Sequence, residues 1–263
     1  MNLQALLRAE PRFHEDASGQ PYSWQVSKYV LSFLDTHVRE GFRTLEVGAG
    51  VSTVLFALKG ATHVCVVPAD EEVSRIKMFC REHAISLDRL TFEVDRSERC
   101  LPQLDVTDLD LVLIDGAHGF PMPFLDWYYT ADRLKVGGLL IIDDTHIWTG
   151  HILKMFLMQE PEWKLEVDFP PRSVVFMKVR EGSREKNESD QAYVLQGTVD
   201  LMFRTYPLYV DWIRSLAPRD LFLQKERSLA FRAFRARYVA RKIISRVVPE
   251  PVKRGFHALL SKF

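Results

Sequence analysis

Apolar residues form five short runs in the first 145 residues, and each run is followed by a stretch with a different spacing. Val, Ile and Leu dominate most of these runs, which show little of the alternation expected of a strand with one face in water. Continuous runs of this kind are typical of parallel strands covered on both faces. We therefore expect strands at residues 44–47, 63–67, 90–94, 109–114 and 139–142.

Between the runs, apolar residues recur at intervals of three and four, which is the spacing of one helix face. Capping residues, and acids in a first helical turn, mark where helices begin. Helices are predicted over residues 52–59, 70–80, 124–135 and 149–159. Strands that alternate with helices predict an α/β fold with a doubly wound, mostly parallel sheet, because crossovers between parallel strands are right-handed.

The two ends of the chain differ from this alternation. Two more strands are expected at 163–169 and 173–179, and the short Pro170-Pro171 link between them favours an antiparallel hairpin. Near the N-terminus, Ser23 is expected to cap a helix that runs through Leu34. The predicted organisation is an N-terminal segment at 1–21, a main domain at 22–180, a charged linker without apolar residues at 181–190, and a helical extension at 191–263.

Composition places the chain among globular proteins, with 47% hydrophobic and 27% charged residues in a length of 263. No apolar run approaches the roughly 20 residues that span a bilayer, and the first residues are too quickly charged for a secretory signal. Cys65, Cys80 and Cys100 are too few and too widely spaced for a disulfide framework or a zinc knuckle. We expect a cytoplasmic protein.

The net charge is zero, but residues 219–263 hold twelve Lys or Arg against three acids. Within them, residues 227–248 predict a basic amphipathic helix. Such a helix could lie on an anionic membrane surface, which would make the protein peripheral there, or pack on the main domain or on a second copy of the chain. Nucleic acid is an unlikely partner because the remaining residues carry a compensating negative charge.

A glycine-containing loop after the first strand is the candidate ligand site. Gly48 and Gly50 allow a sharp turn and close approach of a ligand, because neither has a Cβ. Ser52 and Thr53 can cap the next helix, whose N-terminus favours an anionic group. Glu46 stands at the carboxyl end of the strand, where it would repel a pyrophosphate but suit an ammonium or hydroxyl group.

Three motifs together resemble class I S-adenosylmethionine-dependent methyltransferases: E-x-G-x-G at 46–50, I-D-G-A-H at 114–118 and G-G-x-x-I-x-D-D at 137–144. The resemblance covers about 22–180 and implies a seven-stranded sheet closed by the final hairpin. A nicotinamide dinucleotide site is the competing interpretation, since Asp70 lies about twenty residues beyond the glycines. The second and third motifs favour the methyltransferase.

The resemblance also implies which residues hold S-adenosylmethionine. The family usually has an acid for the ribose hydroxyls where this chain has Pro68, and Asp70 is the expected substitute. Asp95 and Ser97 are expected beside the adenine. The full expected set is Glu46, Gly48, Ala49, Gly50, Ser52, Thr53, Asp70, Asp95, Ser97 and Asp115.

Asp115, Asp143 and Asp144 follow the fourth and fifth strands, whose ends are neighbours in a doubly wound sheet. Gathered carboxylates suit Mg²⁺ or Mn²⁺. The pattern is similar to that of metal-dependent small-molecule and sugar O-methyltransferases, in which the ion binds the acceptor hydroxyl. His118 is the expected general base, with Asp115 as its catalytic partner. The expected acceptor is a small molecule, a sugar or a glycan hydroxyl.

Structural roles remain open for the same residues. Asp143 or Asp144 could cap the next helix, and His118 could bond a loop carbonyl. Two functional alternatives also remain. One is a metal-independent methyltransferase that uses Asp115 and His118 alone. The other is a degenerate cofactor-binding domain that acts as an interaction module through its basic tail.

Overall fold

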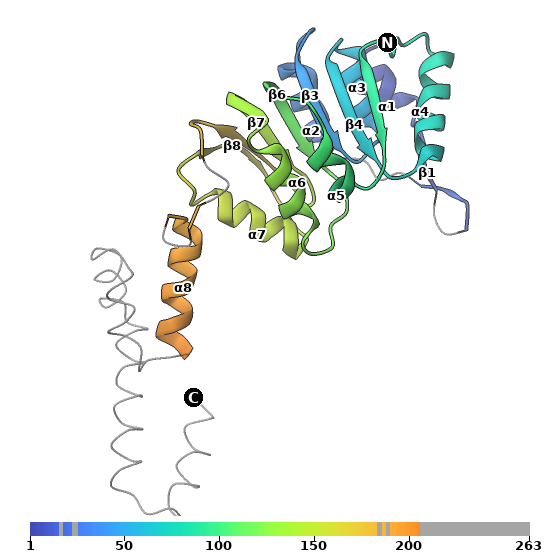
Figure 1. Ribbon diagram of the computed structural model, residues 1–263. Coiled ribbons are helices and arrows are strands. Elements are labelled where there is room, and N and C mark those ends of the chain that lie inside the picture. Colours follow the sequence, from blue (N-terminus) through green and yellow to red (C-terminus); the bar gives the residue numbers. More distant parts are fainter. Residues whose placement is uncertain (16–17, 23–25, 183–185, 188–189, 206–263) are drawn as a thin grey trace, which may run out of the picture. The chain divides into compact units, whose positions relative to one another are not determined.

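Seven strands form one sheet in the first of the two units into which the chain divides, 1–185 and 186–263. The computed structural model describes residues 1–15, 18–22, 26–182, 186–187 and 190–205. The strand order is β5-β4-β3-β6-β7-β9-β8 (Figure 1). The predicted α/β fold with a doubly wound, mostly parallel seven-stranded sheet is confirmed.

Five parallel strands form most of this sheet, with β3 at their centre. Their bounds are β3 Arg43–Val47, β4 Thr62–Val67, β5 Leu90–Val94, β6 Leu109–Ile114 and β7 Leu134–Ile142. The predicted hairpin is also confirmed, because β9 Ser173–Lys178 pairs antiparallel with both β7 and β8 Trp163–Phe169. All five parallel strands therefore point their carboxyl ends toward the same edge of the sheet.

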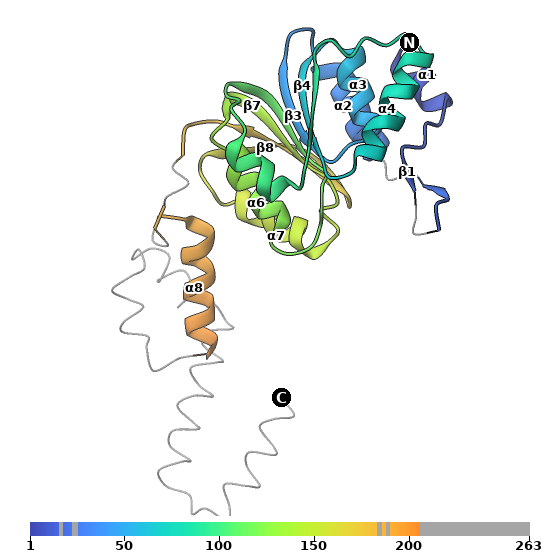
Figure 2. The same cartoon turned by 45° about the vertical axis from the view of Figure 1, so that its right-hand side comes forward.

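Helices cover both faces of the sheet (Figures 1 and 2). On one face the helices share a buried core with strand residues such as Leu113 and Ile141. These helices are α1 Leu3–Arg8, α2 Lys28–His37, α3 Val51–Leu58 and α4 Asp70–Glu82. The opposite face carries α6 Met122–Thr130 and α7 Trp148–Leu157 (Figure 2). Helix α5 Ser97–Cys100 and a 3₁₀ turn at Leu101–Gln103 contact α6.

Three local predictions were wrong. Helix α2 begins at Lys28, not near Ser23, because the Ser27 hydroxyl accepts the Val30 N–H at 3.2 Å and caps the helix there. Strand β7 begins at Leu134, a residue predicted to lie in the preceding helix. Gly137, with φ of +85°, lies inside this strand as an irregularity, although the sequence predicted the strand only from residue 139.

The N-terminal segment holds a feature that the sequence did not predict. Residues His14–Glu15 (β1) and Pro21–Tyr22 (β2) form a two-stranded antiparallel sheet in a stretch for which no strand was predicted. Both strands are only two residues long, so no periodic pattern could have identified them.

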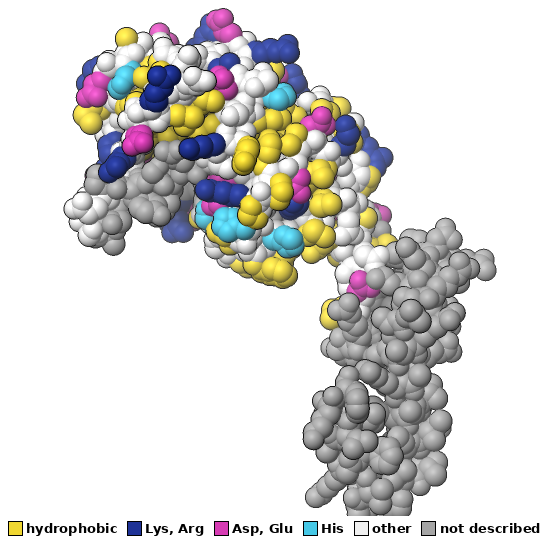
Figure 3. Space-filling model, turned by 180° about the vertical axis from the view of Figure 1, so that it is seen from behind, with side chains coloured by type: hydrophobic (Ala, Val, Ile, Leu, Met, Phe, Trp, Pro, Cys, Tyr) yellow, Lys and Arg dark blue, Asp and Glu magenta, His cyan; other side chains and the backbone are white. Residues whose placement is uncertain are grey.

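The second unit contributes one described helix, α8 Ala192–Thr205. The boundary between the units falls within the predicted linker. The basic helix expected at 227–248 lies outside the described residues. Within the part of the chain that is described, every helix is too short or too polar to cross a membrane. On the surface of the first unit, charged side chains of both signs are intermixed with apolar ones (Figure 3).

Candidate functional site

A cavity of about 860 Å³ opens at the carboxyl ends of the parallel strands, where open α/β sheets bind ligands. Its size falls in the range of pockets for cofactors and small molecules. Each of the five parallel strands, or the segment that directly follows it, supplies part of the wall. The lining residues that matter below are His14, Gly48, Ala49, Pro68, Glu72, Asp95, Ser97, Asp115, His118, Asp144 and Arg172.

The glycine loop forms the centre of the wall. Gly48 has φ of +97°, in the left-handed region, and its N–H donates to the Val66 carbonyl at 2.9 Å. A Cβ at this position would clash with the backbone carbonyl of Asp115. Glycine is therefore required by both the turn and the close approach of the β6 loop.

Glu46 lies beneath this loop and does not line the cavity. Its side chain is buried, and its carboxylate accepts hydrogen bonds from the Thr53 hydroxyl and from His63 Nε2 at 3.1 Å. Thr53 Oγ1 in turn accepts the Gly50 N–H at 2.9 Å. Because Nε2 carries the proton, His63 Nδ1 accepts from the Thr44 hydroxyl at 2.7 Å. This network fixes the loop from below.

Several residues predicted to touch the cofactor do not line the cavity. Of the predicted set, the cavity is lined by Gly48, Ala49, Asp95, Ser97 and Asp115. Glu46, Gly50, Ser52 and Thr53 lie behind this wall. Thr44 and His63 were missed, because a polar residue inside an apolar strand gives no sign of its partners.

The wall near β4 differs from the prediction as well. Asp70 is exposed and does not line the cavity, whereas Glu72, from the same helical turn, does. The Glu72 carboxylate pairs with His14 Nδ1 at 3.1 Å. Neither residue was predicted, because acids at a helix start are expected from the macrodipole alone.

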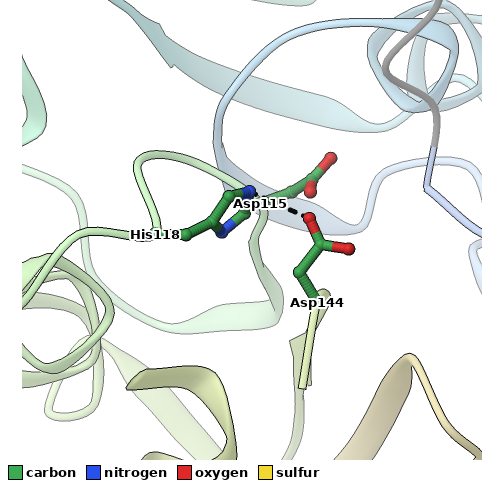
Figure 4. A group of neighbouring side chains, drawn as sticks. All are labelled: Asp115, His118 and Asp144. Atoms are coloured by element: carbon green, nitrogen blue, oxygen red, sulfur yellow. Dashed lines mark ion pairs between the residues drawn. The ribbon is translucent and has the colours of Figure 1, made fainter. Parts of the chain in front are cut away.

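At the opposite side of the cavity, the structure gathers Asp115, His118 and Asp144 (Figure 4). One ligand atom from each lies within 4.8 Å of the others, and His118 Nε2 is 2.9 Å from Asp144 Oδ2. Neighbouring ligands of an octahedral ion at roughly 2.0–2.1 Å lie about 2.9 Å apart. The separation of His118 and Asp144 therefore matches that of two neighbouring ligands, and two carboxylates with an imidazole form a donor set that Mn²⁺ or Mg²⁺ can accept.

Asp143 was predicted to be a metal ligand, but the structure does not bring it into this cluster. Its buried carboxylate accepts from the Ser173 hydroxyl and lies 3.3 Å from Arg172 Nη2. Arg172 Nε also lies 2.9 Å from Asp144 Oδ1. The guanidinium therefore supplies part of the positive charge that the gathered carboxylates need, and His118 takes the place predicted for Asp143.

The electrostatics of the cluster follow from burial and like charge. Desolvation, and then the carboxylates of Asp143 and Asp144, raise the pKa of Asp115 well above its usual range. The hydrogen bond from His118 lowers the pKa of Asp144. The charged form of Asp144 is thus favoured beside the imidazole, whereas burial and the neighbouring carboxylates disfavour the charged form of Asp115.

The loop that carries His118 is fixed by the start of α7. The Thr149 hydroxyl donates to the His118 backbone carbonyl, which leaves the imidazole to pair with Asp144. His118 is about one-third exposed and faces the cavity. The alternative prediction had the His118 ring bond a loop carbonyl, but the ring pairs with the Asp144 carboxylate instead.

Residues 45–145 match the family model of a methyltransferase domain. A search among curated proteins found no significant match. Solved structures with the same fold include a protein from Corynebacterium glutamicum, with 17% identity, a TM-score of 0.54, and coverage of 68% of this chain and 91% of that one.

Two others were solved with a cofactor. For the cofactor-bound protein Rv0187 from MTB, the identity is 17%, the TM-score is 0.54, and 68% of this chain and 90% of that one are covered. For the O-methyltransferase TomG from Streptomyces achromogenes, in complex with SAM, the identity is 16%, the TM-score is 0.53, and 68% of this chain and 92% of that one are covered. At these identities the likeness is one of fold.

Proposed function

We propose that this S-adenosylmethionine-dependent methyltransferase transfers the methyl group to a hydroxyl oxygen of a small molecule, a sugar or a glycan. The observation that carries the proposal is the pairing of His118 with Asp144, beside Asp115, in the wall of the cavity. A hydroxyl must lose its proton as its oxygen attacks the methyl carbon, so a base is needed there. The fold shared with the O-methyltransferase TomG agrees with this chemistry.

His118 and Asp144 can move the proton as a pair. With the Nε2–H donated to Asp144, the imidazole presents the lone pair of Nδ1 to the acceptor hydroxyl. As the oxygen–carbon bond forms and the sulfur–carbon bond of the cofactor breaks, Nδ1 takes the proton. The ionised Asp144 stabilises the resulting imidazolium, as the carboxylate of a catalytic triad does.

The metal-dependent form of the proposal uses the same three residues differently: Asp115, His118 and Asp144 would hold a divalent ion, Mg²⁺ or Mn²⁺. Such an ion supplies a Lewis acid that lowers the pKa of a bound hydroxyl. The raised pKa of Asp115 supports a site in need of positive charge. An imidazole that held the ion could not also act with Asp144 as the base, so the metal-dependent and the base mechanisms are alternatives for His118.

Arg172 favours a second candidate, a methyltransferase that needs no metal. Its guanidinium contacts both Asp143 and Asp144, so the protein itself already places one cation beside the cluster. In that mechanism His118 acts as the general base and Asp144 stabilises its protonated form, as described above. Arg172 limits the repulsion among the carboxylates.

Titration with Mn²⁺, followed by electron paramagnetic resonance, tests the metal site. We expect binding to the wild type and at least tenfold weaker binding to Asp115→Asn and Asp144→Asn. Asp95→Asn is the matched control, because Asp95 lines the same cavity but pairs with Arg99 outside the cluster. Absence of Mn²⁺ binding would reject the metal.

Activity is tested by screening polyols, sugars and phenols for formation of S-adenosylhomocysteine, with Mg²⁺ and with chelator. Loss of activity in chelator supports the metal-dependent mechanism, and full activity in chelator selects the metal-independent one. If S-adenosylhomocysteine also fails to bind in calorimetry, the interaction-module hypothesis becomes the better one.

A further inference from the structure

The cavity has a second polar end, formed by the N-terminal segment and the start of α4. His14 and Glu72 face each other there at 3.1 Å, and both line the cavity. Their side chains are only 9% and 19% exposed, so the pair is part of the wall and not a surface contact. His14 lies outside the region 45–145 that matches the methyltransferase domain.

Further contacts hold this end in place. Arg75, one turn along α4 from Glu72, donates from Nε to the Phe13 carbonyl at 2.5 Å and pairs through Nη1 with Glu15 at 3.1 Å. The rings of Phe13 and Phe79 pack edge to face, with centroids 5.6 Å apart. Residues on both sides of His14 are thus fixed to α4, which holds the imidazole against Glu72.

The shape of the cavity indicates what reaches this end. Asp115, His118 and Asp144 lie at the ends of β6 and β7, and methyl transfer must occur beside them. In the sheet, β4 and β5 lie on the other side of β3. A cofactor that presents its methyl group to the cluster must therefore extend across the Gly48 loop toward Pro68, Glu72 and Asp95.

The charge of this end indicates which part of the cofactor it takes. Glu72, Asp95 and Glu98 all line it, and Asp95 and Glu98 pair with arginines at 3.9 and 2.8 Å. Three acids disfavour the carboxylate of the methionine part but suit the uncharged hydroxyls of the nucleoside. A carboxylate can accept hydrogen bonds from two adjacent hydroxyls, one on each oxygen.

Glu72 is the acid best placed for those hydroxyls. Of the residues between β4 and α4, Pro68 lines the cavity, but its side chain cannot accept a hydrogen bond. Asp70, the first residue of α4, is exposed and does not line the cavity. We propose that the His14–Glu72 pair binds the ribose hydroxyls of the cofactor, with Glu72 as the acceptor and His14 as its positioning residue. This inference rests on the proposed function, namely on the use of S-adenosylmethionine and on methyl transfer beside Asp115, His118 and Asp144, but not on the metal or on the identity of the acceptor.

Calorimetric titration of the full chain with S-adenosylhomocysteine, and with its 2′-deoxy and 3′-deoxy analogues, tests the inference. We expect Glu72→Ala to weaken binding of S-adenosylhomocysteine about 10–100-fold, as for loss of hydrogen bonds to a charged group. The deoxy analogues should bind the wild type more weakly, yet bind Glu72→Ala nearly as well as S-adenosylhomocysteine does. That loss of discrimination identifies contact with the hydroxyls.

Asp70→Ala is the matched control, because it removes an acid from the same helical turn that does not line the cavity. Its affinity should stay within about twofold of the wild type. His14→Ala should weaken binding several-fold, and should add little in combination with Glu72→Ala, since His14 acts through Glu72. Thermal unfolding curves of all variants check that each is folded.

The inference is overturned if Glu72→Ala binds S-adenosylhomocysteine like the wild type, or if it weakens all three ligands equally. The second result would indicate contact with another part of the cofactor, such as its ammonium group. If the wild type binds none of the ligands, the proposed function itself fails.

Discussion

Substitution of Asp126 by Asn gives a sharp test of the electrostatics behind the cavity. Asp126 lies in α6, and its side chain is fully buried behind Gly116. A Cβ added to Gly116 would lie 3.5 Å from Asp126 Oδ2. Within the described residues, neither carboxylate oxygen has a hydrogen bond of normal geometry. Burial raises the pKa of Asp126 to about 7, although Ser97 and His118 act in the opposite direction.

The sign of the effect follows from proton binding. Between the ordinary pKa of 3.8 and the raised value of about 7, the folded state keeps a proton that the unfolded state has lost. The free energy of unfolding contributed by this group is therefore full at low pH and is lost as the pH rises through 7. At about 1.36 kcal/mol per pKa unit, the loss amounts to about 2–3 kcal/mol between pH 5 and pH 8.

Asn cannot ionise, so Asp126→Asn should gain stability over the wild type as the pH rises. Urea unfolding at pH 5, 6, 7 and 8 measures this difference, with exposed Asp88→Asn as the control that should show no trend. A difference between Asp126→Asn and the wild type that stays constant from pH 5 to 8 would refute the reasoning. It would mean that Asp126 is ionised in the folded protein at neutral pH.

Three further substitutions probe the loop and the core. Gly48→Ala should abolish binding of S-adenosylhomocysteine in calorimetry, because a Cβ clashes with the Asp115 carbonyl; retained affinity would contradict the described loop. His63→Leu should weaken binding about tenfold without touching the ligand, because Glu46 loses its partner, while His63→Gln should restore most of it. Lys178→Met should lower the free energy of unfolding by about 2–4 kcal/mol in urea, since two backbone carbonyls lose a buried donor; an unchanged value would show that these carbonyls find other partners.

The fold could be predicted from the sequence because apolar runs and helical spacing are local signals. The strands at 90–94, 109–114 and 163–169 have the bounds expected from these signals alone. The class I methyltransferase resemblance is likewise confirmed by the match of residues 45–145. Its narrower form, a metal-dependent sugar enzyme, stays a prediction.

The site could be predicted only in part, because chain order does not show where a side chain points. Asp143 and Asp144 are adjacent in sequence, yet one is held by Ser173 and the other pairs with His118. In the same way, Asp70 and Glu72 share a helical turn, but only Glu72 lines the cavity. Successive residues after a strand or along a helix turn face different directions, and tertiary contacts decide which one reaches the ligand.

Partners from distant parts of the chain gave no local signal either. His14 and Arg172 approach the cavity from the N-terminal segment and from the turn between β8 and β9. Neither stands near a recognisable motif, and the residues around each give no sign of a distant partner. Only the folded arrangement brings them beside Glu72 and Asp144.

The placement of these two residues has a consequence for how the enzyme can diverge. The region that matches the methyltransferase domain, 45–145, holds the glycine loop and the acidic cluster, but it ends before Arg172 and begins after His14. The glycine loop with the acidic cluster, and the two residues His14 and Arg172, are thus encoded in separate stretches of the chain. Changes in the N-terminal segment could alter cofactor retention, and changes in the final hairpin could alter the acceptor side, while the central machinery stays the same.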